Sequence, residues 1–205
     1  MKVEHVDFLV EEPSMEVFLR AVLPRIIGDL DFSIHSFQCK DDLLKKLESR
    51  LMGYTYWLPD GYRIVVLVDQ DDDECRALKA KLEQCAHSAG LTTRSRDQHS
   101  FIVINRIVVS ELEAWYFGDW SAVVAAYPRV SEAVPRKARF RKPDQITGGT
   151  WEAFERVLQR AGYFKAGLRK HEVAQAIAPH IDPARNVSHS FQVFRAAALE
   201  LAGCV

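Results

Sequence analysis

Residues 63–74 read RIVVLVDQDDDE, and this stretch decides the fold. Its first six residues are almost all apolar and mostly β-branched, which is typical of a strand buried on both faces of a parallel sheet. The strand ends at a run of acidic side chains that begins with Asp69. Asp72 or Asp73 can start the next helix, which we expect to end at Gly90. A strand that passes directly into a helix is the repeating unit of an α/β sheet.

Strand and helix signals alternate on both sides of this stretch. We expect further strands at residues 5–10, 32–37 and 101–109. Helical patterns follow these strands, starting at Pro13, Asp41 and Ser110. The alternation predicts an α/β fold with an open, mostly parallel sheet flanked by helices.

The pattern changes after Trp120. Residues 128–150 hold three prolines, two glycines and many positive charges, so we expect an extended loop. Helical patterns resume at residues 150–161, 168–178 and 188–202. We therefore predict an α/β domain over residues 1–125, with a basic loop and helical extension over residues 126–205 packed on it as one unit.

Composition argues against several classes of protein. Glu4 and Asp7 interrupt the place where a secretory signal would have its apolar core, and no apolar run is long enough to span a bilayer. The four cysteines form no CxxC pair, which indicates free, mostly buried thiols in a reducing compartment. We therefore expect a cytoplasmic protein that does not enter a membrane.

The formal net charge of −1 hides a split along the chain. Residues 1–125 contain 14 Lys/Arg and 21 Asp/Glu, whereas residues 126–205 contain 13 Lys/Arg and 7 Asp/Glu. A basic half favours a polyanionic partner, and an acidic cluster in the other half would need cations. An enzyme that acts on phosphates with the help of a metal ion would require both.

Acidic residues follow three of the predicted strands. Glu11 and Glu12 follow the first strand, and the run from Asp69 to Glu74 follows the central one. Glu111 and Glu113 follow the last. Ligands of open α/β sheets sit beyond the carboxyl ends of the strands, so we expect these side chains to converge there. Carboxylate oxygens suit Mg²⁺ or Mn²⁺.

Each acidic group also has a purely structural interpretation. Glu11 and Glu12 place negative charge where the dipole of the following helix favours it. Ser110 and Glu113 have the spacing of a capping box. The run from Asp69 to Glu74 is harder to explain in this way, because a helix needs one cap and five clustered carboxylates repel one another. The metal hypothesis therefore rests mainly on the central strand.

A dense group of cations lies in the predicted loop. Residues 136–142 read RKARFRK and carry five of them: Arg136, Lys137, Arg139, Arg141 and Lys142. Such a loop can track a phosphate backbone, with Phe140 available for stacking. Further cations that could extend the track are Lys165, Arg169, Lys170 and Arg185, the last beside Ser188 and Ser190. The alternative is an ordinary solvated surface.

Three segments together resemble the Toprim fold, in the branch that includes OLD-type nucleases and proteins of antiphage defence. They are LVEEPSMEVFL, VVLVDQDDDE and SELEAW. Nearly the whole chain is also similar to the bacterial domain-of-unknown-function family 4276. That second similarity is carried by NRIVVSELEAWYFGD, GGTWEAFERVLQRAGYFKAGLRK and IDPARNVSHSF.

The Toprim resemblance implies a role for each acidic group. It implies that Glu11 acts as general acid or base and that Asp69 and Asp71 hold metal. Glu111 or Glu113 matches the additional acid of the nuclease branch, and Asp73 completes the predicted metal-binding set. Toprim sequences usually have Gly after the first Glu, whereas this chain has Glu12, so the local turn and the metal geometry can differ.

The leading hypothesis is a Mg²⁺- or Mn²⁺-dependent nuclease that hydrolyses phosphodiester bonds of DNA or RNA. The resemblance implies a partner ABC-type ATPase in a defence or toxin system, since the chain has no GxxxxGK[ST] motif of its own. A homo-oligomer is also compatible with the sequence. One alternative is a non-catalytic subunit that binds nucleic acid or regulates an ATPase. Another is a phosphatase or transferase that uses Asp69 and Asp71.

Overall fold

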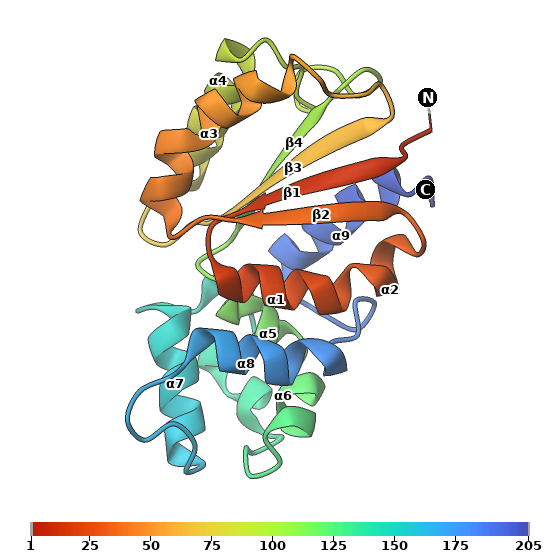
Figure 1. Ribbon diagram of the computed structural model, residues 1–205. Helices are drawn as coiled ribbons and strands as arrows, with labels where there is room; N and C mark the ends of the chain where they lie inside the picture. Colours follow the sequence, from red (N-terminus) through yellow and green to blue (C-terminus); the bar gives the residue numbers. More distant parts are fainter. Residues whose placement is uncertain (1, 205) are drawn as a thin grey trace.

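A computed structural model describes residues 2–204 and is built on a four-stranded sheet (Figure 1). The strands are β1 (His5–Val10), β2 (Asp31–Ser36), β3 (Tyr62–Asp69) and β4 (Val103–Val108). All neighbours pair in parallel, in the order β2-β1-β3-β4. The predicted α/β class and open sheet are therefore confirmed, and the sheet is wholly parallel.

The strand register places the acidic segments together. Val10 of β1 pairs with Leu67 of β3, and Asp69 of β3 pairs with Val108 of β4. The residues that follow β1, β3 and β4 therefore leave the sheet at one edge, which lies on the left in Figure 1. This is the carboxyl edge of the sheet, where open α/β folds place their ligands.

Helices cover both faces of the sheet. One face carries α3 (Lys40–Tyr54) and α4 (Cys75–Ser88), and the other carries α1 (Pro13–Val22), α2 (Pro24–Ile27) and α9 (His189–Leu201) (Figure 1). Alternate residues of β3 serve the two layers: Val66 and Val68 pack with α3 and α4, whereas Val65 and Leu67 face the other side. Strands covered on both faces are apolar throughout, which is why residues 64–68 are an unbroken apolar run.

A second helical layer lies beyond α1 (Figure 1). It contains α5 (Glu113–Gly118), α6 (Trp120–Ala126), α7 (Thr150–Arg160) and α8 (Lys170–Ile177), with the short 3₁₀ helix Ala178–His180 after α8. Trp115 of α5 is fully buried and packs on Phe18 of α1 and on Phe191 and Phe194 of α9. Phe194 in turn contacts Phe8 in the sheet, with ring centroids 6.4 Å apart. One apolar core therefore joins the sheet to the C-terminal helices.

Two predicted helix starts are wrong. Glu74, rather than Asp72 or Asp73, caps α4, because its carboxylate accepts hydrogen bonds from the N–H groups of Arg76 and Ala77 in the first turn. The proposed capping box at Ser110 does not form: in the described chain α5 begins at Glu113, and Ser110 has a left-handed φ of 62° that sets it outside the helix.

Two other expectations also need correction. The predicted loop contains three single-turn 3₁₀ helices, at Val134–Arg136, Ala138–Phe140 and Pro143–Gln145. The cysteines are free as predicted, but they are not mostly buried, since Cys39 and Cys204 are exposed. None of the helices within residues 2–204 has the length and apolar character that crossing a bilayer requires.

Candidate functional site

Three buried carboxylates from neighbouring strand ends form the centre of the site, and we call Glu11, Asp69 and Glu113 the acid cluster. Glu11 follows β1 and is 9% exposed, and Asp69 ends β3 and is 2% exposed. The backbone N–H of Asp69 donates to Glu11 Oε2 at 3.0 Å. Glu113 begins α5, the helix that follows β4, and is 2% exposed. The three predicted acidic segments thus meet at the carboxyl edge of the sheet.

Burial dominates the electrostatics of the acid cluster. It raises the pKa of Glu11 to about 7, although the hydrogen bond from Asp69 opposes the change. Burial, together with the negative charges of Glu11 and Glu113, raises the pKa of Asp69 well above its ordinary value. Burial also raises the pKa of Glu113 to about 8. Carboxyl groups disposed in this way either keep protons at neutral pH or need cations nearby.

Two oxygens of the acid cluster have no hydrogen-bond partner among the residues that the structure describes. Asp69 Oδ2 accepts a hydrogen bond from the N–H of Leu112 at 3.3 Å, but Asp69 Oδ1 and Glu113 Oε2 are buried and accept none from any described residue. Leaving a buried polar atom without a partner costs about 1–3 kcal/mol, and more when the group is charged. Unsatisfied carboxylate oxygens at a strand edge are therefore candidates for cation ligands.

Lys40 neutralises the turn that follows Asp69. Its ammonium forms ion pairs with Asp71 Oδ2 at 2.6 Å and with Asp73 Oδ2 at 2.9 Å. Burial alone would lower the pKa of Lys40, but these two carboxylates raise it above its ordinary value. Asp71 also lies near enough to Glu11 for its charge to raise the pKa of Glu11. Asp71 therefore pairs with Lys40 and also acts electrostatically on the acid cluster.

A second lysine approaches from the C-terminal helices. Lys170, the first residue of α8, lies 3.3 Å from both carboxylate oxygens of Glu12 and 5.2 Å from the centre of the Trp151 ring. Burial would lower the pKa of Lys170, but the charges of Glu113, Glu12 and Asp69 raise it. Lys170, one of the cations predicted to contact phosphate, thus lies beside the acid cluster. Glu12, which departs from the Toprim pattern, is its partner.

Glu111 has a structural role at the start of α7. Its Oε2 accepts hydrogen bonds from the Thr150 hydroxyl and from the Trp151 N–H, both at 2.7 Å. It also lines a cleft of about 650 Å³ beside the acid cluster, which we call the acidic cleft. The residues lining it are Asp71, Asp72, Ser110, Glu111, Ile146, Gly148, Gly149 and Glu152. Four carboxylates around one cleft would repel an anionic ligand unless cations were present.

The backbone is strained at two residues that line the acidic cleft. Asp71 and Ser110 have left-handed φ angles of 49° and 62°, and the Asp71 N–H donates to the Ser110 carbonyl at 2.8 Å. Side chains other than Gly rarely adopt this conformation, and each instance costs of order 1–3 kcal/mol. Strain of this kind persists where the surrounding structure fixes a side chain in a particular position.

The predicted basic loop is exposed and borders the acidic cleft. Its five cations all lie on the surface. Arg139 donates to the carbonyl of Thr147 at 2.9 Å, next to Gly148 in the cleft lining. Phe140, however, is not free for stacking as predicted, because its ring stacks on Phe117 at 5.0 Å between centroids. The loop thus presents charge to solvent while its aromatic residue serves the core.

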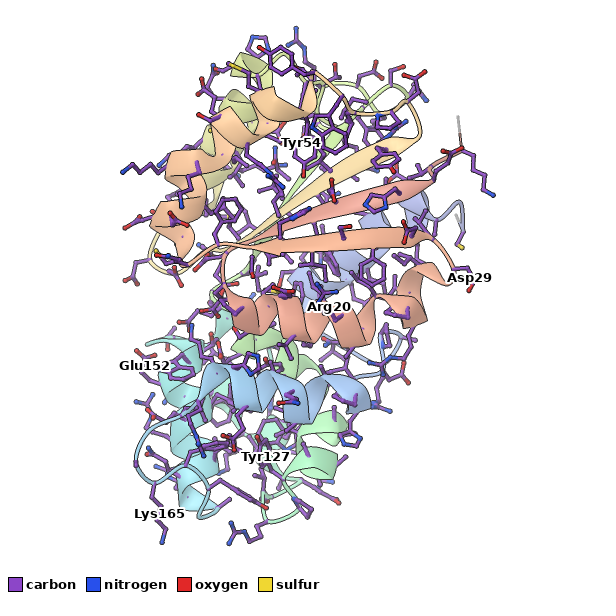
Figure 2. The ribbon with its side chains drawn as sticks, in the orientation of Figure 1. Arg20, Asp29, Tyr54, Tyr127, Glu152 and Lys165 are labelled. Carbon is purple, nitrogen blue, oxygen red and sulfur yellow. The ribbon has the colours of Figure 1, made fainter. Side chains whose placement is uncertain are left out.

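Only some of the cations predicted to extend this basic surface are placed to contact a phosphate backbone. Lys165 lies at the end of the helical layer farthest from the sheet, whereas Glu152 lies on the sheet side (Figure 2). Arg169 is exposed and pairs with Glu172 at 2.9 Å. Arg185 is unsuitable, because it pairs with the buried Asp119 at 2.7 Å.

The two serines proposed beside Arg185 are structural as well. Ser188 and Ser190 both donate to Asp144 Oδ1, at 2.9 and 2.6 Å. They help to fix the start of α9 and are not available to a phosphate.

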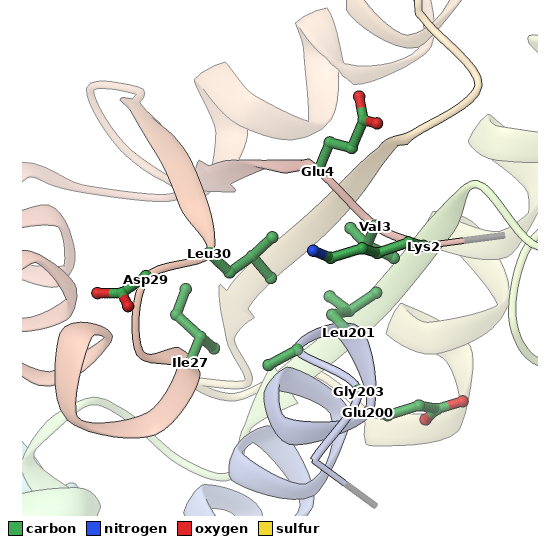
Figure 3. Close-up of a pocket in the computed structure, with 10 residues that line it drawn as sticks. Lys2, Val3, Glu4, Ile27, Asp29, Leu30, Glu200, Leu201 and Gly203 are labelled. Carbon is green, nitrogen blue, oxygen red and sulfur yellow. The ribbon is translucent and has the colours of Figure 1, made fainter.

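A separate pocket of about 570 Å³ lies at the opposite edge of the sheet (Figure 3). Ile27, Leu30 and Leu201 form its apolar wall and Lys2 reaches across it, while the carboxylates of Glu4 and Asp29 point away (Figure 3). The third acidic residue of its lining, Glu200, pairs with Arg94 at 2.6 Å, so the acid cluster remains the stronger candidate site.

The donor chemistry of the acid cluster fits a hard divalent cation, but the side chains are not yet arranged around one. Within residues 2–204 no group of three or more His, Cys, Asp or Glu side chains stands ready to hold a metal ion. The six predicted ligands are divided into three groups. Glu11, Asp69 and Glu113 form the acid cluster, and Asp71 and Asp73 form ion pairs with Lys40. Glu111 accepts hydrogen bonds from the first residues of α7. The two unpartnered buried oxygens are the observation that fits a cation.

Sequence reasoning missed the two residues that hold this arrangement together. Lys40 and Trp151 are distant in sequence from the acidic segments that they serve. A role for Lys40 could have been found in the sequence, because a lysine at the first position of a helix opposes the helix dipole and needs another reason to be there. Nothing in the sequence pointed to Trp151, since an aromatic residue on an amphipathic helix is most often part of the core.

Comparison with known proteins identifies a family. A family model described as "Domain of unknown function (DUF4276)" matches residues 10–198. No curated protein and no solved structure matches the chain.

Proposed function

The chain belongs to the DUF4276 family, and we propose that this member is a nuclease of the Toprim type that hydrolyses phosphodiester bonds with the help of Mg²⁺ or Mn²⁺. The observation that carries the proposal is the acid cluster. Its three carboxylates come from three neighbouring strand ends and are buried, and Asp69 Oδ1 and Glu113 Oε2 have no hydrogen-bond partner within residues 2–204. Stable folding does not require such an arrangement, because burying several like charges is costly.

The residues that would hold the metal are Glu11, Asp69 and Asp71, with Glu113 behind them. All supply carboxylate oxygens, which magnesium and manganese prefer. A bound divalent cation would lower the pKa of a water ligand and neutralise charge on the phosphate. We assign Asp73 and Glu111 to supporting roles, because Asp73 is held by Lys40 and Glu111 anchors the start of α7.

Two further side chains have properties that suit phosphodiester hydrolysis. Glu11, with a pKa of about 7, can take up or release a proton near neutral pH, which is what a general acid or base requires. Lys170 keeps its positive charge and lies beside Glu12, where it can neutralise a non-bridging phosphate oxygen. Its position on the Trp151 ring limits where the ammonium can move.

The surface around the acidic cleft suits a polyanion. The exposed loop of residues 136–142 borders the acidic cleft at Arg139 and would bind the phosphates on either side of the scissile bond. Contacts to phosphates position a nucleic acid without reading its sequence. We therefore propose a backbone-binding nuclease, which would work in a defence or toxin system with an ATPase supplied by a partner.

A cleavage assay tests this proposal. Wild type and Asp69→Ala/Asp71→Ala are incubated with plasmid DNA, total RNA and tRNA in Mg²⁺, in Mn²⁺ and in EDTA. Glu48→Gln is the matched control, since Glu48 is an exposed acid on α3. We expect metal-dependent cutting by wild type and by the control, and none by the double variant. Absence of cutting on every substrate, with a neighbouring ATPase also supplied, would refute nuclease activity.

One feature favours a second candidate function, a non-catalytic subunit that binds nucleic acid or regulates an ATPase. Lys40 and Lys170 already supply two positive charges to the site, and protons bound to the acid cluster would neutralise more of its negative charge without a metal ion. In such a protein the basic loop would still bind nucleic acid. Nucleic-acid binding that is insensitive to divalent ions and to Asp69→Ala, without cleavage, would favour this candidate.

A further inference from the structure

Four oxygens surround the Lys40 ammonium at the turn after β3. The carbonyl oxygens of Asp69 and Gln70 accept hydrogen bonds from it at 3.1 and 2.9 Å. The carboxylates of Asp71 and Asp73 lie 2.6 and 2.9 Å away. The Lys40 side chain is 14% exposed, so the ammonium is largely enclosed by this ring of oxygens. Such a ring is itself a cation site, and a side chain of the same protein fills it.

The position of Lys40 in its own helix is unfavourable. It is the first residue of α3, where the helix dipole disfavours a cation, and Asp41 and Asp42 follow it. Cys39, the N-cap residue, gives the helix no side-chain cap within the described chain. A lysine at this point therefore gains its stability from the Asp71 turn and not from α3.

We propose that Lys40 is a built-in counter-ion that competes with the divalent cation for Asp71 and so sets the metal affinity of the site. This inference rests on the proposed metal site. Asp71 is the residue at issue, because its carboxylate pairs with Lys40 at 2.6 Å and its charge also raises the pKa of Glu11. Its side chain is 40% exposed, so it can exchange one cation for the other by rotation. Metal entry then removes one of the two carboxylates from the Lys40 ammonium and leaves it less enclosed, with Asp73 and the two carbonyl oxygens as its remaining partners.

Competition and simple support predict opposite results for removal of Lys40. If Lys40 merely supports the turn, its loss loosens Asp71 and weakens metal binding. If it competes, its loss frees Asp71 and removes a positive charge a few Å from the metal, so binding becomes about tenfold tighter. The ion-free protein should lose thermal stability in both cases, because Asp71 and Asp73 are then left to repel each other.

The test is calorimetric titration of Mn²⁺ into wild type, Lys40→Gln and Lys46→Gln. Lys46 is the matched control, because it lies on the same helix and pairs with its own aspartate, Asp42. We expect Lys40→Gln to lower the Kd for Mn²⁺ about tenfold and Lys46→Gln to leave it unchanged. Asp69→Asn should abolish binding in each background.

A second measurement needs no variant and covers the case in which Lys40→Gln does not fold. Wild type is acetylated with acetic anhydride with and without saturating Mg²⁺, and each lysine is followed by mass spectrometry. We expect Lys40 to react faster with Mg²⁺ present and Lys46 to be unaffected.

The outcomes separate the two proposals. Wild type that binds Mn²⁺ through Asp69, with equal or weaker binding in Lys40→Gln, or with a Lys40 that Mg²⁺ does not expose, would overturn the competition and leave the metal site intact. If neither wild type nor Lys40→Gln binds Mn²⁺, the metal site and this inference both fail.

Discussion

Glu113→Gln tests whether the acid cluster is as costly to the fold as its burial implies. Glu113 is 2% exposed, and its Oε2 accepts no hydrogen bond from the described residues. Burial raises its pKa from 4.5 to about 8. A group whose pKa is raised on folding contributes most stability below its unfolded pKa, and this contribution is lost as the pH rises through the folded pKa. The relevant window therefore runs from about pH 4.5 to about pH 8.

The magnitude follows from this pKa difference. Between pH 5 and pH 8 the unfolded chain releases the proton of Glu113 while the folded protein still retains it. Without divalent ions, wild type should therefore lose roughly 3 kcal/mol of unfolding free energy over this range through Glu113. Glutamine has nearly the same shape and no proton to lose, so Glu113→Gln should not show this loss.

Urea denaturation at pH 5 and pH 8 in EDTA measures the effect. We expect Glu113→Gln to gain stability relative to wild type as the pH rises. The difference in unfolding free energy, variant minus wild type, should be roughly 3 kcal/mol higher at pH 8 than at pH 5. The exposed Glu48→Gln should give a pH-independent difference. If Glu113→Gln also gave a pH-independent difference, Glu113 would be ionised in the fold already, and the reasoning from burial would be wrong.

Three further predictions concern the metal and the fold. Mg²⁺ should raise the Tm more at pH 8 than at pH 5.5 in scanning calorimetry, because Glu11, with a pKa of about 7, must lose its proton to act as a ligand; an equal rise would count against Glu11. Asp119→Ala should lower the unfolding free energy in urea by about 2–3 kcal/mol, since the buried Asp119 carboxylate accepts hydrogen bonds from Arg185 and a backbone N–H; a loss below about 0.5 kcal/mol would contradict this. Gly149→Ala should cost about 1–2 kcal/mol, because Gly149 has a φ of 77° and the Glu152 carboxylate occupies the place of the new methyl group; Glu152→Ala should recover part of the loss, and no recovery would argue against the contact.

The sequence predicted the sheet and its acidic edge because both depend on local patterns. The apolar run of residues 64–68 indicated a doubly covered strand, and the acids that follow Val10 and Val68 were placed by the rule that parallel strands end at one edge. The converging positions of Glu11, Asp69 and Glu113 follow from that rule and the strand order.

The features that the sequence did not predict depend on contacts between segments that are distant along the chain. Lys40 reaches the Asp71 turn because α3 begins at the same edge where β3 ends, which no local pattern states. Phe140 was predicted to be free for stacking, yet the path of its loop brings it onto Phe117. Any acid in the run from Asp72 to Glu74 has the chemistry of a helix cap. Only the position at which α4 begins selects Glu74, and the sequence does not show that position.

The central claim, that the acid cluster is a divalent-metal site, is tested most directly by a crystal structure with Mn²⁺ and its anomalous difference map. We predict a strong anomalous peak at the carboxyl edge of the sheet, bonded to carboxylate oxygens of Glu11 and Asp69, with Asp71 turned away from Lys40. A map from fully soaked crystals with no peak at these residues, and with Asp71 still paired to Lys40, would contradict the claim.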